Sequence, residues 1–525
     1  MVSQPILLAL FLVLFVFLLK LFLSKKYNKP KEYNVPYPPS PPAIPIIGHL
    51  HLLKPLLHHA FRDLSDRYGP VISLRLGSAR FIVVNTPSLA KEILKTNELV
   101  YSSRKMNIVI NTVVYDNATF AFAPYGTYWK FIKKLSTFEL LGNQTLGQFL
   151  PIRTRELHEF IRTLANKSKF EDSLNLTQAL MTLSNNIISR MMLSIETSGT
   201  DSQAEQARVL VREVTLSFGE FNISDFIGFC KNFDLQGLKK KALDLHKRYD
   251  AFLEKIICDR EESRKKFKVE GESCVNEEEK VKDFLDILLD VSEAKDCEVD
   301  FTRNHIKSLI LDYFTAATDT TAISLEWAIA ELYNNPMVLK KMQEEVDMVV
   351  GKERLVCEAD ISNLPYTNAV IKETMRLHPP LPMIARKGVE DCVVDGNMIP
   401  KGSIVCVNVW AMGRDEKIWE NPLEFRPERF IESDIDVKGH NFELLPFGSG
   451  RRACPGMPLA MRELPTVMGA LVQCFEWKMT DSESKILGYG KKIDMDERPG
   501  LTAPRANDLF GIPVARLNPI PFLQV

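Results

Sequence analysis

The sequence predicts a mainly α-helical protein with small β-sheets, built as one large domain behind an apolar N-terminal segment. Residues 127–264 and 302–334 carry helical periodicity over long stretches with few Gly or Pro. Strand-like runs are short, such as residues 71–76 and 81–84. No Gly/Ser-rich linker divides the 525 residues, so a single large domain is the simplest interpretation.

The composition limits the classes of function. The formal net charge is -1 and 45% of the residues are hydrophobic, as in an ordinary globular protein. A near-zero charge does not favour nucleic-acid binding, which usually shows a basic excess. The cysteines are odd in number, lie far apart and form no CxxC pair. We therefore expect no disulfide framework, no zinc site and a reducing compartment.

The N-terminus predicts a membrane anchor over residues 1–24. Residues 5–23 are apolar and about long enough to cross a bilayer, and Lys20 can reach the interface from one end. A cleaved secretory peptide is the alternative, but no basic residue precedes the stretch and no A-x-A site follows it. The positive-inside rule places the rest of the chain in the cytosol, because basic residues follow directly at Lys25, Lys26, Lys29 and Lys31.

A basic, proline-rich hinge is expected over residues 25–48. Prolines this dense exclude a helix and favour a stiff, extended spacer between anchor and domain. Residues 49–525 then form the main domain. Five N-x-[ST] sequons lie in it and would be silent in the cytosol: Asn117, Asn143, Asn166, Asn175 and Asn222.

Further elements follow along the main domain. Residues 265–282 are charged and predict an exposed loop. Residues 302–334 predict a helix roughly 50 Å long, enough to cross the whole domain, which ends at Asn334-Asn335-Pro336. More helices are expected up to His378, with short strands and turns after them.

The stretch from Phe447 to Gly456 reads FGSGRRACPG and is the most informative in the chain. Gly448, Gly450 and Gly456 permit tight backbone conformations there. A dinucleotide pattern, G-x-G-x-x-A, also fits, but it requires a preceding strand and a βαβ unit and is weak this close to the C-terminus.

This stretch resembles the cytochrome P-450 signature F-x-x-G-x-R-x-C-x-G at every fixed position. The resemblance implies the cytochrome P-450 fold and haem b, with Cys454 as the axial ligand of the iron and Arg452 on a haem propionate. Phe447, Gly448 and Gly456 would shape the cofactor site. Electrons would come from NADPH through NADPH-cytochrome P-450 reductase, and the activity would be that of a monooxygenase.

A second motif is Glu373-Thr-Met-Arg376, which places both charges on one face of a helix. Alone it would be an ordinary ion pair. With Arg429 downstream in Pro-Glu-Arg-Phe, it resembles the family's Glu-Arg-Arg triad, whose role is structural.

Ala316-Ala-Thr-Asp-Thr-Thr lies midway along the long helix and resembles the family's oxygen-activation motif. The resemblance implies that Thr320 serves oxygen activation and that Asp319 relays protons. The alternative is an ordinary helix whose Thr bonds back to its own carbonyls. Ala317 stands where the family usually has glycine, which leaves somewhat less room above the iron.

Three residues match propionate-binding positions of the family. Trp129 and Lys133 resemble the W-x-x-x-R motif, although Lys133 lacks the bidentate fork of arginine. Arg386, after the E-x-x-R helix, matches another such position.

Within the family, residues 57–69, 121–129, 314–322 and 496–505 resemble the plant flavonoid-oxidising branch, above all flavone synthase II and flavanone 2-hydroxylase. The resemblance implies C2–C3 desaturation of a flavanone such as naringenin to a flavone such as apigenin. It also implies a single-pass protein of the endoplasmic reticulum membrane, with its catalytic domain in the cytosol.

The same resemblance suggests which residues contact the flavonoid, and plain core packing is the alternative for each. They are Phe120, Phe122, Phe314, Ala316, Ala317, Met383 and Leu501.

Other functions stay open at this point. The same branch could hydroxylate a flavanone at C2, with or without aryl migration, or hydroxylate an aromatic ring. A hydroperoxide-rearranging relative and a non-catalytic, membrane-anchored haem protein are the other classes. The intact Asp319-Thr320 pair argues against both.

Overall fold

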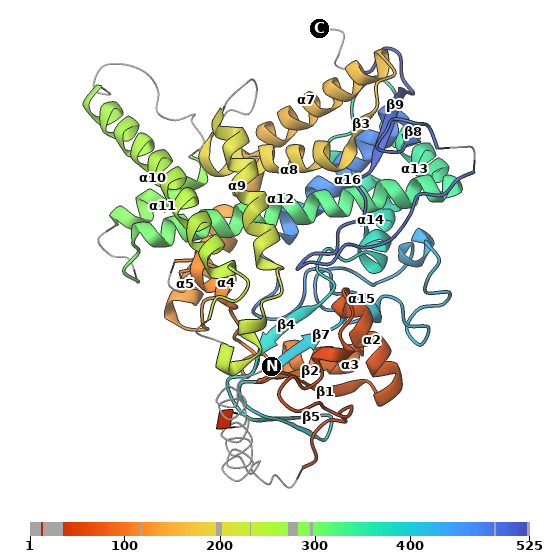
Figure 1. Ribbon diagram of the computed structural model, residues 1–525. Helices are drawn as coiled ribbons and strands as arrows, with labels where there is room; N and C mark the ends of the chain where they lie inside the picture. Colours follow the sequence, from red (N-terminus) through yellow and green to blue (C-terminus); the bar gives the residue numbers. More distant parts are fainter. Residues whose placement is uncertain are drawn as a thin grey trace, which may run out of the picture.

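The computed structural model describes residues 12–13, 35–115, 118–195, 202–230, 233–270, 282–294, 298–487 and 490–521. Helices dominate this part of the chain and the strands form small sheets, so the predicted mainly α fold is confirmed (Figure 1). The helices are α2 (Leu57–Tyr68), α3 (Pro87–Lys91), α4 (Ile108–Val113), α5 (Thr127–Leu135), α6 (Asn143–Gln148), α7 (Leu150–Lys169), α8 (Leu176–Leu193), α9 (Ser202–Phe218), α10 (Leu238–Glu270), α11 (Phe284–Glu293), α12 (Arg303–Asn334), α13 (Pro336–Val349), α14 (Pro365–Leu377), α15 (Val409–Met412) and α16 (Met457–Cys474). Shorter helical turns are η1 (Leu50–Leu52), η2 (Glu92–Thr96), η3 (Ser136–Leu140), η4 (Ile223–Asp225), η5 (Gly228–Cys230), η6 (Glu358–Asn363) and η7 (Pro427–Phe430).

The largest sheet joins the beginning of the domain to its later part. Its strand order is β1-β2-β7-β4, and β2 runs parallel to β7, which follows more than 300 residues later in the chain. The other sheets have the orders β3-β9-β8 and β5-β6. The strands are β1 (Val71–Leu76), β2 (Ala79–Val84), β3 (Leu174–Asn175), β4 (Ile384–Lys387), β5 (Cys392–Val394), β6 (Asn397–Ile399), β7 (Ile404–Val407), β8 (Phe475–Thr480) and β9 (Phe510–Ala515).

Helix α12 forms the axis of the domain and crosses the middle of the molecule (Figure 1). Its first residue follows Thr302, which forms a capping box with His305, and its last precedes Asn335-Pro336. It is apolar nearly all round because α8, α9, α14 and α16 pack against it. The predicted long helix is therefore confirmed at both ends.

The predicted loop at residues 265–282 is wrong at its start. Helix α10 continues to Glu270, because lysine and glutamate are good helix formers even in a highly charged segment. Residues 271–281 lie outside the described residues.

The predicted anchor lies almost wholly outside the described residues. None of the helices in the described ranges combines the length and the apolar composition that crossing a bilayer requires. The end of the expected hinge is docked on the sheets. The carbonyl of Pro36 accepts the N–H of Met398 at 2.7 Å, and that of Pro39 accepts the N–H of Ser73 at 2.8 Å.

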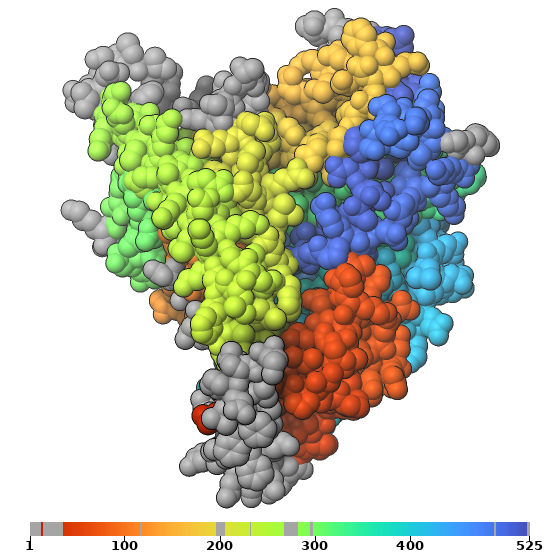
Figure 2. Space-filling model, viewed as in Figure 1, coloured from red at the N-terminus to blue at the C-terminus, as the bar shows by residue number. Residues whose placement is uncertain are grey.

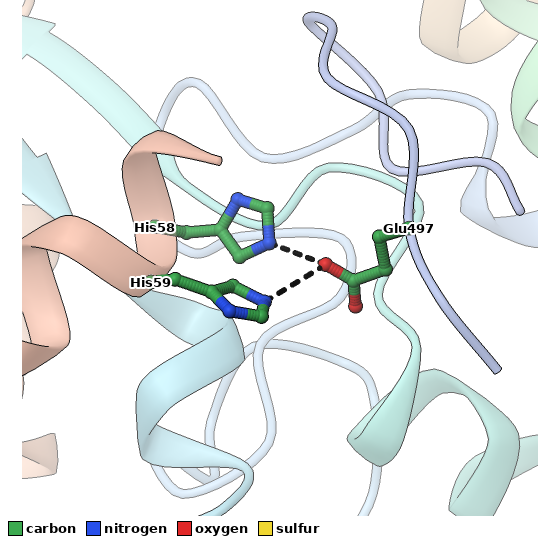
Figure 3. A group of neighbouring side chains, drawn as sticks. All are labelled: His58, His59 and Glu497. Atoms are coloured by element: carbon green, nitrogen blue, oxygen red, sulfur yellow. Dashed lines mark hydrogen bonds and ion pairs between the residues drawn. The ribbon is translucent and has the colours of Figure 1, made fainter. Parts of the chain in front are cut away.

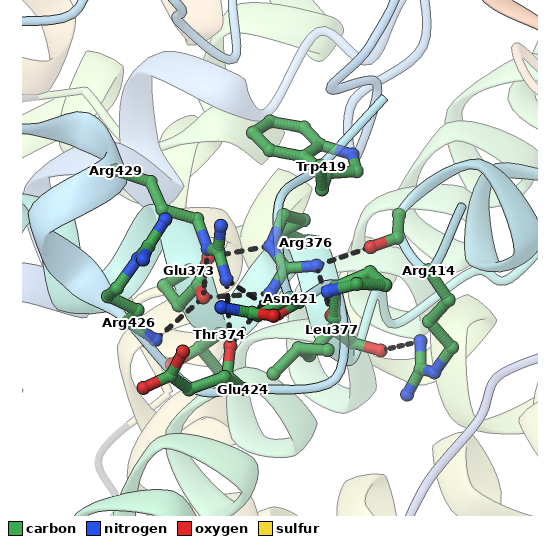
Figure 4. Close-up of polar contacts among 12 residues, drawn as sticks. Glu373, Thr374, Arg376, Leu377, Arg414, Trp419, Asn421, Glu424, Arg426 and Arg429 are labelled. Carbon is green, nitrogen blue, oxygen red and sulfur yellow. Dashed lines mark hydrogen bonds and ion pairs between the residues drawn. The ribbon is translucent and has the colours of Figure 1, made fainter. Parts of the chain in front are cut away.

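A fully buried carboxylate, Glu373, organises the chain after α15 (Figure 4). Arg376 donates to both of its oxygens, at 2.6 and 2.8 Å, and Arg429 donates at 3.2 Å. The backbone N–H of Arg426 adds a bond of 2.8 Å. The structure thus brings the three residues of the expected triad together.

Arg376 extends this cluster to irregular backbone. Its guanidinium also donates to the carbonyls of Gly413, Pro422 and Glu424. Glu373 and Arg376 have no accessible side-chain surface. Removing one partner of such a pair typically costs about 3–5 kcal/mol, because the other charge is left buried and alone.

Figure 2 shows that the N-terminal part of the domain, in red, adjoins C-terminal segments in blue on one face of the molecule. Residues more than 400 positions apart in the sequence touch there, as His58 and Glu497 do.

Candidate functional site

The loop from Phe447 to Gly456 lies directly before α16 and closes on itself, because the N–H of Cys454 donates to the carbonyl of Phe447 at 2.9 Å. Gly448 and Gly450 have positive φ angles of 70° and 72°. A Cβ on Gly450 would lie 2.1 Å from the carbonyl oxygen of Leu94, so only glycine fits there.

Gly456 does not need glycine for its backbone conformation, contrary to expectation. Its φ is -80°, in the ordinary right-handed region. A Cβ would lie 3.7 Å from the Sγ of Cys454, which is normal van der Waals contact. Its value to the site is open space beside the sulfur.

Cys454 presents its thiol to an interior space. Part of its surface is accessible, although the residue lies deep inside the protein. Burial raises the pKa of the thiol, while backbone N–H groups of Gly456 and Met457 and the charges of Lys133 and Arg104 lower it. Burial is the larger effect and leaves the pKa raised, while the N-terminus of α16 and the nearby cations act toward the thiolate.

Three arginines face the same region and all bind neutral carbonyls. Arg104 donates to Ala121 O at 3.1 Å, Arg386 donates to Arg452 O at 3.2 Å, and Arg452 donates to Ser102 O at 2.9 Å. Within the described residues, none of these guanidinium groups forms an ion pair with a carboxylate.

Burial lowers the pKa of each of these arginines, and repulsion from neighbouring arginines lowers those of Arg386 and Arg452 further. The pKa of Arg386 lies well below its ordinary value, and that of Arg452 falls to about 9. Buried cations without an anion are costly, so the site suits a ligand that carries negative charge. A haem, with two propionates and an iron that accepts a thiolate, fits these residues.

Helix α5 brings Trp129 and Lys133 to this region, one turn apart. The indole N–H of Trp129 donates to Phe120 O at 3.1 Å, and the guanidinium of Arg452 lies 4.4 Å from the Trp129 ring centroid. Burial lowers the pKa of Lys133, while the charge of Cys454 raises it. Lys133 therefore adds a further positive group near the sulfur.

Asp312 on α12 fixes the loop that carries Phe120. It accepts from Thr119 Oγ1 and from the N–H of Phe120, each at 2.6 Å. Burial raises its pKa to about 6, although these bonds and Arg104 act in the opposite direction. The long helix thereby positions a side chain of the expected substrate region.

Asp319 and Thr320 lie mid-way along α12 and have separate partners. The hydroxyl of Thr320 donates to Ala316 O at 2.7 Å, as in the alternative reading of this motif. Asp319 accepts from Thr502 Oγ1 at 2.9 Å. Burial raises the pKa of Asp319, and the Thr502 bond lowers it.

The expected substrate residues divide into two groups. Ala316 and Leu501 are exposed, and Phe120, Phe122, Ala317 and Met383 keep part of their surface accessible. Phe122 makes an edge contact with Phe218 of α9. Phe314 is only 2% exposed and packs in the main core cluster, so the structure does not support a ligand contact for it.

Arg104 contributes to the site without having been assigned a role from the sequence, and Asp312 and Thr502 lie in segments expected to contact substrate but form hydrogen bonds that were not predicted. Arg104 and Thr502 lie outside the signature motifs, and folding brings them to α12 and Cys454 from distant segments. Asp312 precedes the oxygen-activation motif on α12, where an acidic residue among apolar neighbours was its only signal.

An interior cysteine with amide donors at its sulfur, surrounded by unpaired cations, is the arrangement that a haem-thiolate protein requires. The chain belongs to the cytochrome P-450 family, whose sequence pattern matches residues 38–500. Membership implies a haem-iron cofactor, monooxygenase activity and electrons supplied by a reductase.

The chain is similar over nearly its whole length to plant members. It is 73% identical to cytochrome P-450 93B16 of Glycine max, over 100% of both chains. It is 46% identical to 3,9-dihydroxypterocarpan 6A-monooxygenase of Glycine max, covering 94% of this chain and 96% of that protein. It is 44% identical to 2-hydroxyisoflavanone synthase of Glycyrrhiza echinata, covering 93% and 94%.

Among solved structures, a zebra fish cytochrome P-450 with progesterone superposes with a TM-score of 0.72 at 25% identity. The match covers 87% of this chain and 99% of that one.

The glycines of the Cys454 loop give a direct test of this geometry. Gly450→Ala forces a Cβ against Leu94 O and a positive φ on alanine, which we expect to cost roughly 3 kcal/mol or more. The carbon monoxide difference spectrum of the reduced protein should then show little thiolate-bound haem. Gly456→Ala is the matched control and should keep most of the signal. Equal signals from both variants would contradict the assignment.

Proposed function

We propose that this chain is an NADPH- and O2-dependent haem-thiolate monooxygenase of the flavone synthase II type, which converts flavanones to flavones by C2–C3 desaturation. The observation that carries the chemistry is the Cys454 site, with its amide donors and unpaired cations. The flavonoid branch motifs support the substrate class. So do the relatives named for pterocarpan and isoflavanone oxidation.

The cofactor in this proposal is haem b, bound by Cys454 as a thiolate. Arg452, Arg386, Lys133 and Trp129 serve its propionates, and their positive charges and donors suit that role. Phe447, Gly448 and Gly456 shape the loop. When bound, the haem activates dioxygen with electrons that NADPH-cytochrome P-450 reductase supplies.

Asp319 and Thr320 move the protons that the reaction consumes. Burial raises the pKa of Asp319, so its carboxyl is a better proton acceptor than that of an ordinary aspartate. The hydroxyl of Thr320 passes protons onward when it leaves Ala316 O. Thr502 holds Asp319 in place and is a positioning residue.

The substrate region suits a flat aromatic molecule. Phe120 and Phe122 offer aromatic faces, and Ala316 and Ala317 leave a low wall on α12. Desaturation requires that the C2–C3 edge of the flavanone lie over this wall, so that hydrogens leave adjacent carbons. Leu501 and Met383 complete the contacts.

Hydroxylation at C2 is the second candidate, and the name of the isoflavanone relative favours it. The chain is 73% identical to the 93B16 protein but only 44% identical to that synthase, so it stands apart from the isoflavanone branch. An aromatic-ring hydroxylase or a non-catalytic haem protein has less support, because the Asp319-Thr320 pair and the flavanone-type motifs are intact.

We also propose that the protein resides in the endoplasmic reticulum membrane through residues 1–24, with its catalytic domain in the cytosol. The apolar stretch at residues 5–23 and the four lysines after it support this topology.

The thiolate assignment is tested by a pair of cysteine variants. Cys454→Ala should abolish the red-shifted Soret band of the reduced, carbon monoxide-bound protein, because it removes the proposed thiolate ligand. Cys474→Ala is the control, since Cys474 is buried in α16, and it should keep the band. Loss of the band in the control variant alone would refute the assignment.

The role of Asp319 is tested through Thr502. Thr502→Val removes a hydrogen bond that stabilises the ionised carboxylate, so the pKa of Asp319 should rise further. The limb of the pH–turnover profile that Asp319 controls should move to higher pH by about half to one unit. Thr502→Ser keeps the hydroxyl and should retain the original profile. Superimposable profiles for all three proteins would exclude the role.

The product is tested with microsomes that contain the protein, a reductase and NADPH. Naringenin should give apigenin directly, without an accumulating intermediate. If 2-hydroxyflavanone is the sole product before acid treatment, the protein is a 2-hydroxylase instead. Ring hydroxylation alone would overturn the branch assignment and leave the haem-thiolate chemistry intact.

A further inference from the structure

A second cluster of possible metal ligands lies away from Cys454, where α2 meets the C-terminal loop (Figure 3). We propose that His58, His59 and Glu497 form a binding site for a divalent transition-metal ion of the zinc type. The proposal goes beyond the monooxygenase activity and does not depend on it.

The ligand atoms already converge. His58 Nε2 lies 2.5 Å and His59 Nε2 lies 3.2 Å from the same carboxylate oxygen, Glu497 Oε2. One ligand atom from each residue lies within 4.8 Å of the others. Tetrahedral zinc places ligand atoms about 3.3 Å apart at bond lengths of about 2.0–2.2 Å, so modest side-chain adjustments would admit the ion.

The donor set is selective. Two imidazole nitrogens and one carboxylate oxygen are ligands that suit Zn²⁺, Ni²⁺ and Cu²⁺. Mg²⁺ and Ca²⁺ prefer oxygen ligands alone and should bind poorly. This donor set contains no cysteine. The expectation that the chain has no zinc site rested on the absence of CxxC pairs, and that argument does not cover a site of this kind.

Neighbouring side chains hold the ligands in position. The indole N–H of Trp410 donates to the other carboxylate oxygen, Glu497 Oε1, at 2.7 Å, which leaves Oε2 for the imidazoles. The ring of His59 stacks on Trp410 at a centroid distance of 4.0 Å, and His58 meets it edge-on at 5.0 Å. Support of this kind orients metal ligands and strengthens binding.

Access and charge set the expected affinity. The side chain of His59 is 37% exposed, so an ion can enter and a water can complete its coordination. The guanidinium of Arg414 lies 3.9 Å from Glu497 Oε1 and opposes a second cation. We therefore expect a moderate, micromolar affinity rather than the tight binding of a structural zinc finger.

The site would tie α2 to the loop that also carries Thr502. Glu497 lies five positions before Thr502, the residue that donates to Asp319. A bound ion would restrain this loop from its far end.

A direct test uses the full-length, haem-containing protein in detergent, with Zn²⁺ as the probe. A chelator first removes metal ions other than the haem iron. Equilibrium dialysis with elemental analysis should show one Zn²⁺ per chain in the micromolar range. His59→Gln and Glu497→Gln should each weaken binding at least about tenfold. His440→Gln, at an exposed histidine outside the cluster, is the matched control and should bind as the unchanged protein does.

A second measurement guards against misfolding. The carbon monoxide difference spectrum establishes that a variant is folded, and Zn²⁺ should raise the Tm of the unchanged protein but not of His59→Gln. The proposal is overturned if the unchanged protein retains no zinc at micromolar concentration. It is equally overturned if His59→Gln and Glu497→Gln retain as much as the control.

Discussion

The unpaired positive charge around Cys454 is the constraint on which the rest of the structure depends. Arg386 and Arg452 are buried, and with Arg104 they bind only carbonyl oxygens. A buried cation without an anion costs several kcal/mol, and three close together also repel one another. A fold that accepts this cost is built to receive a negatively charged group. The same cations stabilise a thiolate at Cys454. The negative charges of the cofactor and of the thiolate therefore both compensate the buried positive charge.

The Glu373 cluster also contains buried charge, but there the charge is paired within the protein. Glu373 is wholly buried, but Arg376, Arg429 and the N–H of Arg426 satisfy it. Its partners anchor the irregular chain that precedes the Cys454 loop without using any cation of the site. Stability and cofactor binding therefore rest on separate sets of charges. This separation is why the site can keep its arginines free of carboxylates.

The parts of the site that could be predicted are those with short sequence spacing. Cys454 lies within one loop of its glycines, and Glu373 lies one turn from Arg376, so local patterns suffice. Arg104 and the bond from Thr502 to Asp319 escaped prediction, because only the folded chain brings these residues together. The ligand contact predicted for Phe314 stays a prediction, because α12 is apolar nearly all round and periodicity then cannot tell which face meets a ligand. The loop predicted at residues 265–282 was wrong at its start for a similar reason, because charged residues are common in helices as well as in exposed loops.

The environment of Asp319 depends on a loop without regular secondary structure. Thr502 in this loop bonds Asp319, and the next carbonyl, that of Ala503, accepts the indole N–H of Trp327 at 3.0 Å. Asp319 and Trp327 lie two turns apart on α12, so the helix itself sets the position of Thr502. At the other end of the loop, Glu497 bonds His58 of α2. Asp319 and α2 are therefore connected through one short segment that is held at both ends.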